Sequence, residues 1–264
     1  MKKYELTSET KVINGVKLHR IKAIESFGSV GKGDLGGWIE SEKNLSQRGD
    51  AWVGRHAIVY DNARVYDNAM ISGNAVVRGN AVVRRNAKVG GNAVVSGNAI
   101  VSGNAVVCGN AVVCGNAVVR RNANVGGNAV VSENAVVSGT VVVSENATVC
   151  ENAKVGGNAT VDGNARIGGD ACVYDNAKVG GNAEVSGNAV VGESADFIVF
   201  KNWWSSCRYF TWTRSNNKWK VGCFYGTGEE LIAKAYKDSA KSGREYERVV
   251  KYVESILEEE NNNK

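Results

Sequence analysis

The chain has 264 residues, with 32 basic and 27 acidic side chains and a formal net charge of +5 at pH 7. This mild excess of basic residues, interleaved with acidic ones, does not by itself argue for nucleic acid, and we expect no nucleic-acid partner. No apolar run approaches the roughly 18 residues of a transmembrane helix, and the N-terminus lacks the apolar stretch of a signal peptide. We therefore expect neither membrane insertion nor export.

Residues 1–38 are predicted to form a β-hairpin cap. The apolar segments 11–13 and 16–21 flank Asn14-Gly15, a dipeptide typical of a type I′ hairpin turn. Ile39 and Leu45 continue the phase of the repeat that follows, with larger side chains. We expect them to plug the open end of a repeat array, which would otherwise expose core and strand edges.

Residues 39–195 are predicted to form a prism of short parallel strands. A six-residue unit, Gly-Asn-Ala-x-Val-x, runs from Ala51 to Ala195 without insertion, and 24 of its 25 Ala positions hold Ala, the exception being Val141. This period is too short for helical solenoids, which need about 20–50 residues per unit. In strands, Ala and the Val or Ile two places later would point inward, and residues 18 apart would stack on one another.

Asparagine fills 20 of the 25 positions that precede the repeated Ala. We interpret these residues as structural corners, because Asn tolerates positive φ better than other non-glycine residues. Stacked amides can also hydrogen-bond along a ladder, as they do in cross-β structures. The absence of proline fits a chain in which nearly every backbone N–H joins a ladder.

The repeat resembles that of the hexapeptide-repeat family, the left-handed parallel β-helices, as in Val95-Ser96-Gly97-Asn98-Ala99-Ile100. The resemblance implies a mainly β fold, but the family includes acyltransferases, metal-dependent hydratases and proteins with no known activity. Segments 33–46 and 222–231 are similar to parts of phage and prophage repeat proteins. Those proteins are often described as transferases on the fold alone, which is only an analogy. The resemblance implies a phage or prophage protein in a bacterial cytoplasm.

The cysteine spacing predicts free thiols. No two of the six cysteines are 18 residues apart, and Cys114 and Cys150 share a corner two coils apart, at roughly 9.6 Å by the strand spacing. That distance exceeds the reach of a disulfide and is consistent with a reducing cytosol. The sequence contains no Cys-x-x-Cys motif, so we expect no zinc site.

The sequence offers no catalytic constellation. Acyltransferases of the resembled family use a histidine base, usually with a loop that interrupts the repeat, and its hydratases use three histidine ligands. This chain has only His19 and His56, and His56 occupies a corner position in an array without a loop. We therefore predict no catalytic residue, no metal and no cofactor.

Two outward faces are predicted to be apolar over four consecutive coils. Their residues are Val76, Val94, Val112 and Val130 on one face, and Val82, Ile100, Val118 and Val136 on the next. Such contiguous apolar surface favours self-association, and the family resemblance implies a trimer. The alternative is plain repeat duplication with residues of high β-propensity.

A pair of arginine dipeptides lies on one corner of the predicted prism. Arg84-Arg85 and Arg120-Arg121 are two coils apart, with Ser102-Gly103 between them. Guanidinium groups around a small-residue gap could hold a phosphate or carboxylate through paired hydrogen bonds. The alternative is a solvated edge that blocks edge-to-edge stacking.

Residues 196–264 are predicted to form a small α+β module. Strands at 209–213 and 218–221 would pair through a turn at 216–217, with Phe210, Trp212, Trp219, Val221 and Cys223 on one face. Thr227-x-x-Glu230 is a capping box that opens one helix, and a second would follow Gly243. Trp203, Trp204 and Arg208 could form a partner-binding surface, or the aromatic residues could be the module's core.

Three functions remain open. The first is a non-catalytic scaffold or binding protein, acting as a homo-oligomer and contacting a host protein through the C-terminal module. The second is a phage protein that sequesters a small anionic ligand, such as a host nucleotide signal. The third is an acyltransferase-like enzyme with a site between subunits, using His56 or a cysteine.

Overall fold

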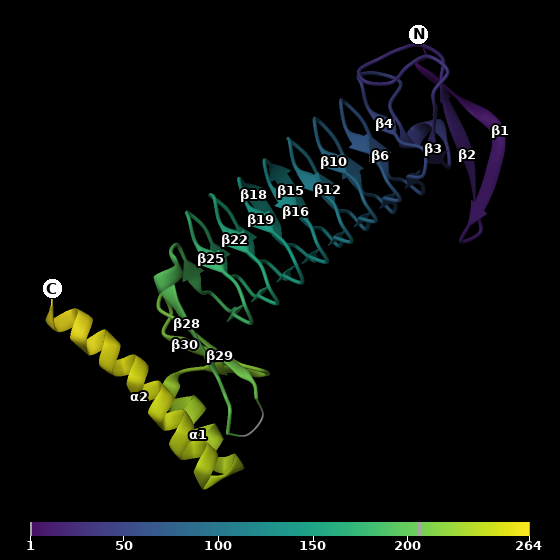
Figure 1. The fold of residues 1–264 in the computed structure, drawn as a ribbon. Coiled ribbons are helices and arrows are strands. Elements are labelled where there is room, and N and C mark those ends of the chain that lie inside the picture. The colour runs from purple at the N-terminus through teal and green to yellow at the C-terminus, as the bar shows by residue number, and fades with distance from the viewer. Residues whose placement is uncertain (1, 205–206, 264) are drawn as a thin grey trace.

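A computed structural model describes residues 2–204 and 207–263. A long prism of stacked coils carries a β-hairpin at its N-terminal end and a small antiparallel sheet with two helices at its C-terminal end (Figure 1). The predicted hexapeptide-repeat β-solenoid is confirmed, because strands 18 residues apart pair in parallel on three faces. No helix among the described residues is both long and apolar enough to cross a bilayer.

Each face of the prism is a parallel sheet whose strands come from every third repeat unit. The first face contains β3 (Leu35–Ile39), β5 (Ile58–Val59), β8 (Val76–Val77), β11 (Val94–Val95), β14 (Val112–Val113), β17 (Val130–Val131), β20 (Thr148–Val149), β23 (Arg166–Ile167) and β26 (Glu184–Val185). The second contains β6 (Arg64–Val65), β9 (Val82–Val83), β12 (Ile100–Val101), β15 (Val118–Arg121), β18 (Val136–Gly139), β21 (Lys154–Val155), β24 (Cys172–Val173) and β27 (Val190–Val191). The third contains β4 (Trp52–Val53), β7 (Met70–Ile71), β10 (Lys88–Val89), β13 (Val106–Val107), β16 (Asn124–Val125), β19 (Val142–Val143), β22 (Thr160–Val161) and β25 (Lys178–Val179).

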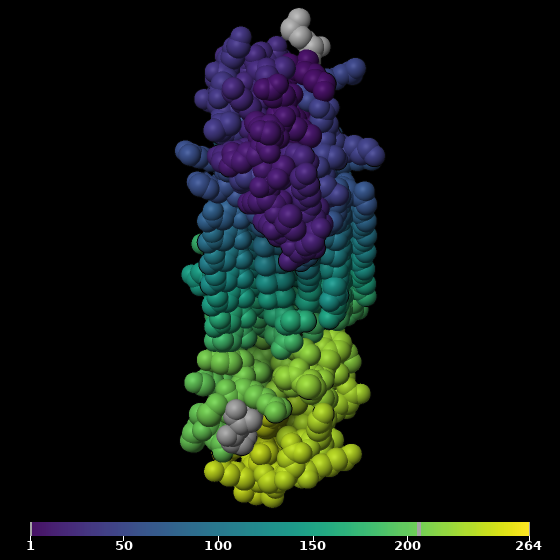
Figure 2. Space-filling view, turned by 90° about the vertical axis from the view of Figure 1, so that its right-hand side faces the viewer, coloured from purple at the N-terminus to yellow at the C-terminus, as the bar shows by residue number. Residues whose placement is uncertain are grey.

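The inward positions are those that the repeat predicted. From Ala51 to Val191, every repeated Ala and the Val or Ile two places later is at most 1% exposed. The residue between them faces outward, and these outward side chains stack in straight rows along the prism (Figure 2). Backbone N–H groups of one coil donate to carbonyls of the next, as from Val94 to Ala111 at 2.9 Å. The strands between the two ends of each described sheet therefore have hydrogen-bonded neighbours on both sides.

The corners differ from the sequence prediction in one respect. Positive φ belongs to the residue before each Asn, such as Gly73 (φ 60°) or Asp61 (φ 59°), and not to the Asn itself. Glycine predominates at that position because it adopts left-handed conformations without strain. The predicted amide ladder is confirmed: Asn98 donates to Asn116 at 2.9 Å, and the same bond recurs along all three corners.

The N-terminal end of the prism exposes backbone carbonyls, and side-chain donors cover them. The ammonium of Lys3 donates to the carbonyls of Gly49 and Ala51 at 2.8 and 2.7 Å. Asn44, at the end of the 3₁₀ turn η1 (Glu42–Asn44), donates to the carbonyls of Asp61 and Ala63, both at 2.9 Å. These contacts satisfy polar groups that have no preceding coil to bind.

The predicted hairpin lies beside this end as β1 (Tyr4–Ile13) and β2 (Val16–Ala23), joined at Asn14 and Gly15, which both have positive φ. It projects along the flank of the first coils (Figures 1 and 2). Because β2 pairs with β3, the hairpin extends the first face.

The C-terminal end exposes N–H groups, and oxygen acceptors cover these. The hydroxyls of Thr211 and Ser215 accept from the N–H groups of Glu184 and Val190 at 2.8 and 2.7 Å. Asp196, in the 3₁₀ turn η2 (Ser194–Asp196), accepts from Gly192 N–H at 2.7 Å. Both ends of the solenoid are therefore closed by groups of the matching polarity.

The C-terminal module contains one antiparallel sheet and two helices. The strands are β28 (Phe197–Lys201), β29 (Tyr209–Thr213), β30 (Lys218–Val221) and β31 (Phe224–Gly226), followed by α1 (Gly228–Asp238) and α2 (Ala240–Asn262). Four of the five residues predicted to share one face are buried in its core, but Cys223 is exposed in a turn.

The capping box that opens α1 is confirmed, whereas α2 begins before Gly243, at an N-cap formed by Ser239. Gly243 therefore lies inside α2, where a Cβ would meet the Tyr236 ring of α1 at 2.2 Å. The absence of a side chain at Gly243 allows the two helices to pack closely.

Candidate functional site

The four predicted arginines line one hollow on the corner between the second and third faces. The hollow has a volume of about 480 Å³, and its lining consists of Arg84, Arg85, Ile100, Ser102, Gly103, Val118, Arg120 and Arg121. We call it the arginine groove. Its middle coil contributes only the small residues Ser102 and Gly103 at the corner, which leaves the space between the two arginine pairs open. None of the described residues that line the groove carries a carboxylate.

The side chains of Arg84 and Arg120 are directed away from the middle of the groove. Arg84 Nη1 donates to the Tyr66 hydroxyl at 3.4 Å, one coil toward the N-terminus. Arg120 Nε donates to the Ser138 hydroxyl at 3.2 Å, one coil toward the C-terminus. The two guanidinium groups are thus held on opposite sides of Ser102. Nε of Arg84 is buried without a hydrogen-bond partner in the described part of the chain.

Arg85 and Arg121 adopt a backbone conformation that arginine rarely takes. Their φ angles are 62° and 65°, in the left-handed region where non-glycine residues cost about 1–2 kcal/mol. Acidic residues at the equivalent position of other coils gain a hydrogen bond there: Asp61 accepts from Gly79 N–H at 3.0 Å, and Asp67 accepts from Arg85 N–H at 3.1 Å. A guanidinium group cannot accept this bond, because it is only a donor.

None of the groove arginines forms an ion pair with any residue that the structure describes. Four positive charges therefore gather on one corner without a side-chain ion pair among the described residues, and two of them sit on unfavourable backbone geometry. The nearby carboxylate of Asp67 accepts from the Arg85 backbone N–H.

Ile100 and Val118 also line the groove, a role that the sequence analysis did not assign. The sequence contained the information needed to place them. Ile100 and Val118 precede Ser102 and Arg120 by two positions, and the 18-residue coil stacks them on each other beside the corner. Both also belong to the apolar row of the second face. The groove is consequently a charged corner with an apolar wall.

The structure brings each predicted apolar row together on one face. Val76, Val94, Val112 and Val130 are cross-strand neighbours on β8, β11, β14 and β17. Val82, Ile100, Val118 and Val136 are neighbours in the same way on β9, β12, β15 and β18. All eight remain partly exposed. The rows then turn polar, with Thr148 and Arg166 on the first face and Lys154 on the second.

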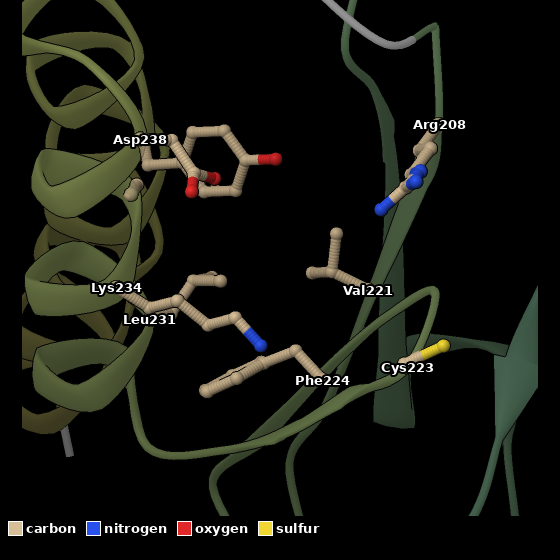
Figure 3. A pocket seen from close by; sticks show the side chains of 9 residues that line it. Arg208, Val221, Cys223, Phe224, Leu231, Lys234 and Asp238 are labelled. Carbon is tan, nitrogen blue, oxygen red and sulfur yellow. The ribbon is translucent and has the colours of Figure 1, made fainter.

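The predicted partner-binding residues of the C-terminal module are not equivalent. Trp203 is 77% exposed, whereas Trp204 packs edge-on against Phe210 and Tyr246, with ring centroids 5.9 and 5.7 Å away. Trp204 is therefore part of the module's core. Arg208 extends into a small cavity of about 70 Å³ between the sheet and the helices, together with Lys234, Asp238 and Tyr246 (Figure 3).

His56 is exposed at a corner, where it occupies the place of an Asn. The six cysteines are free, and Cys150 is buried. Within residues 2–204 and 207–263, no group of three or more His, Cys, Asp or Glu side chains gathers in a way that could hold a metal ion.

The repeat and the three-faced parallel solenoid define a hexapeptide-repeat β-helix fold. A family model of the YdcK β-solenoid repeat matches residues 87–103 and 95–109, in the middle of the prism. No curated protein matches the sequence significantly.

Several solved structures of bacterial proteins are similar in part. The UDP-N-acetylglucosamine acyltransferase of Francisella novicida is 18% identical with a TM-score of 0.40, and the match covers 51% of this chain and 62% of that one. A Bacillus cereus protein named as a candidate acetyltransferase is 15% identical with a TM-score of 0.36, over 72% of this chain and 99% of that one. LpxA of Acinetobacter baumannii is 11% identical with a TM-score of 0.27, over 56% and 66%. The chain thus spans less than two thirds of the Francisella enzyme, and likeness at these values says nothing about activity.

Proposed function

We propose that the protein is a non-catalytic β-solenoid scaffold of phage or prophage origin that assembles into homotrimers in the bacterial cytoplasm. The observation that carries this proposal is the pair of apolar rows on the first and second faces. A row of four aliphatic side chains on adjacent strands repeats at the strand spacing, about 4.8 Å. The rows of a second copy have the same spacing, so the two sets of side chains can interdigitate.

The closed ends support side-by-side assembly. Hydrogen bonds from Lys3 and Asn44 cover one end, and the C-terminal module covers the other. Growth by end-to-end stacking is therefore blocked, and the sides remain for self-association. A head-to-tail ring in which each copy uses two different patches closes at three subunits when neighbouring copies are related by a threefold rotation. The polar coils beyond Thr148 would lie outside this contact.

Sedimentation velocity of a charged double variant tests the assembly. Val94→Lys with Val136→Lys places one charge in each apolar row and outside the arginine groove, so the protein should become monomeric with an unchanged circular dichroism spectrum. Val106→Lys with Val142→Lys makes the same change on the third face and should leave the trimer intact. A wild-type monomer, or a Val94→Lys/Val136→Lys trimer, would refute the proposed interface.

The non-catalytic role rests on the uninterrupted repeat and on the isolated position of His56. It has a separate test, since purified protein should not turn over acyl donors. Donor turnover that His56→Ala abolishes in a folded protein would favour an acyltransferase-like enzyme instead. The C-terminal module, through Trp203, is then the part of the scaffold that we propose contacts a host protein, and pull-downs with Trp203→Ala test that contact.

A further inference from the structure

We propose that the arginine groove binds a small diphosphate ester, with the diphosphate between the two arginine pairs and an apolar or aromatic group against Ile100 and Val118. This site goes beyond the scaffold function, and it shares Ile100 and Val118 with the second-face row that we propose for self-association. The groove combines a charged rim with an aliphatic wall in about 480 Å³, a size within the range of small-molecule sites.

The charge of the groove calls for an anion. Arg84, Arg85, Arg120 and Arg121 form no ion pair among the described residues, and no acidic residue lines the groove. Guanidinium groups match phosphate oxygens through paired, charge-assisted hydrogen bonds. The unpartnered Nε of Arg84 adds a buried donor at the same place.

The spacing of the groove favours two linked anionic groups. Arg84 and Arg120 are two coils apart, roughly 10 Å by the strand spacing. Their bonds to Tyr66 and Ser138 hold them on opposite sides of Ser102. A single phosphate can face only one pair closely, whereas a diphosphate presents oxygens to both once Arg84 and Arg120 exchange their bonds to Tyr66 and Ser138 for the ligand. Ser102, which lies between them and is 8% exposed as a residue, offers a further donor through its hydroxyl.

The backbone of the groove supplies an independent argument. Arg85 and Arg121 are the only basic residues with positive φ in the described solenoid, and glycine would be the unstrained choice there. Acidic residues at that position accept hydrogen bonds from the next coil, but arginine cannot. Residues held in such sparsely populated backbone conformations cluster at ligand-binding sites.

This conformation provides a test that separates binding from stability. Arg85→Gly with Arg121→Gly removes two charges while relieving the left-handed strain. The variant should melt at the same or a higher temperature than the wild type. Its affinity for adenosine diphosphate, measured by isothermal titration calorimetry, should fall roughly tenfold or more. Glu145→Gly, at the same position of another corner (φ 58°), is the matched control and should bind normally.

Three further measurements define the ligand class. Ser102→Phe retains all four arginines but fills the groove, so it should weaken adenosine diphosphate binding by a similar factor. Pyrophosphate should bind more weakly than adenosine diphosphate because it lacks a group for the aliphatic wall. Adenosine should not bind, because it lacks the phosphates.

The proposal is overturned if the wild type does not bind adenosine diphosphate, or if the Arg85→Gly/Arg121→Gly variant binds it as well as the wild type does. Equal affinity for pyrophosphate would remove the role of Ile100 and Val118. Sedimentation velocity of the same samples gives the number of subunits. A monomer that binds adenosine diphosphate would refute only the scaffold assembly.

Discussion

Replacing Val107 with Ala tests the interior of the prism most directly. Val107 is fully buried and is paired with Val89 and Val125 on the adjacent strands. Losing two carbon atoms costs about 1.6 kcal/mol of transfer free energy, at about 0.8 kcal/mol per methylene. The backbone ladder prevents collapse, so a cavity of about 50 Å³ adds about 1.2 kcal/mol. We expect the free energy of unfolding to fall by about 3 kcal/mol.

Val106→Ala is the matched control, because Val106 is the outward neighbour on the same strand, β13. Its substitution should cost less than about 0.5 kcal/mol. Urea unfolding followed by circular dichroism measures both values. Hydrogen exchange should show that the loss of protection in Val107→Ala is concentrated on β13 and its neighbours, because each coil contacts only the next. Equal costs for the two variants would refute the inward and outward assignment.

Two further predictions concern the interior and the N-terminal end. Ala111→Leu, between the buried Ala93 and Ala129, should cost roughly 1–3 kcal/mol by overpacking, and an unchanged melting temperature would contradict a narrow prism. Burial lowers the pKa of Lys3 from 10.5 to about 8, partly opposed by nearby carboxylates. The unfolded chain therefore retains this proton to higher pH, and stability should rise between pH 7.5 and 9.5, by roughly 2 kcal/mol at most. Urea titrations should show this rise in the wild type but not in Lys3→Met, and parallel pH profiles would refute it.

The solenoid could be predicted because a six-residue repeat without insertions is compatible with only one stacking of short strands. An inward Ala followed two places later by an inward Val cannot form a helix face, and the uninterrupted unit fixes which residues stack. The positions of the groove arginines and of both apolar rows follow from the 18-residue coil alone. The conformation of the Asn corners was assigned one residue too late, although glycine before each Asn carried the signal.

The end contacts were not predictable, because they join residues far apart in the sequence. Lys3 contacts Ala51, 48 residues away, and the path of the hairpin decides this contact. The outward tilt of Arg84 and Arg120 similarly depends on side-chain conformations. In the C-terminal module no repeat fixes the register, so the neighbouring Trp203 and Trp204 could not be assigned to surface and core. Only the packing of Trp204 on Tyr246 separates them.

The opposite polarity of the two closed ends gives the prism a modular length. Lys3 and Thr211 each contact only the coil at their own end. Adding or removing eighteen residues would therefore preserve both sets of bonds and move the ends apart or together by one strand spacing, about 4.8 Å. A change of six residues would instead turn the C-terminal module by one face. The length of the solenoid can therefore change in steps of one coil while its two ends keep the same relative phase.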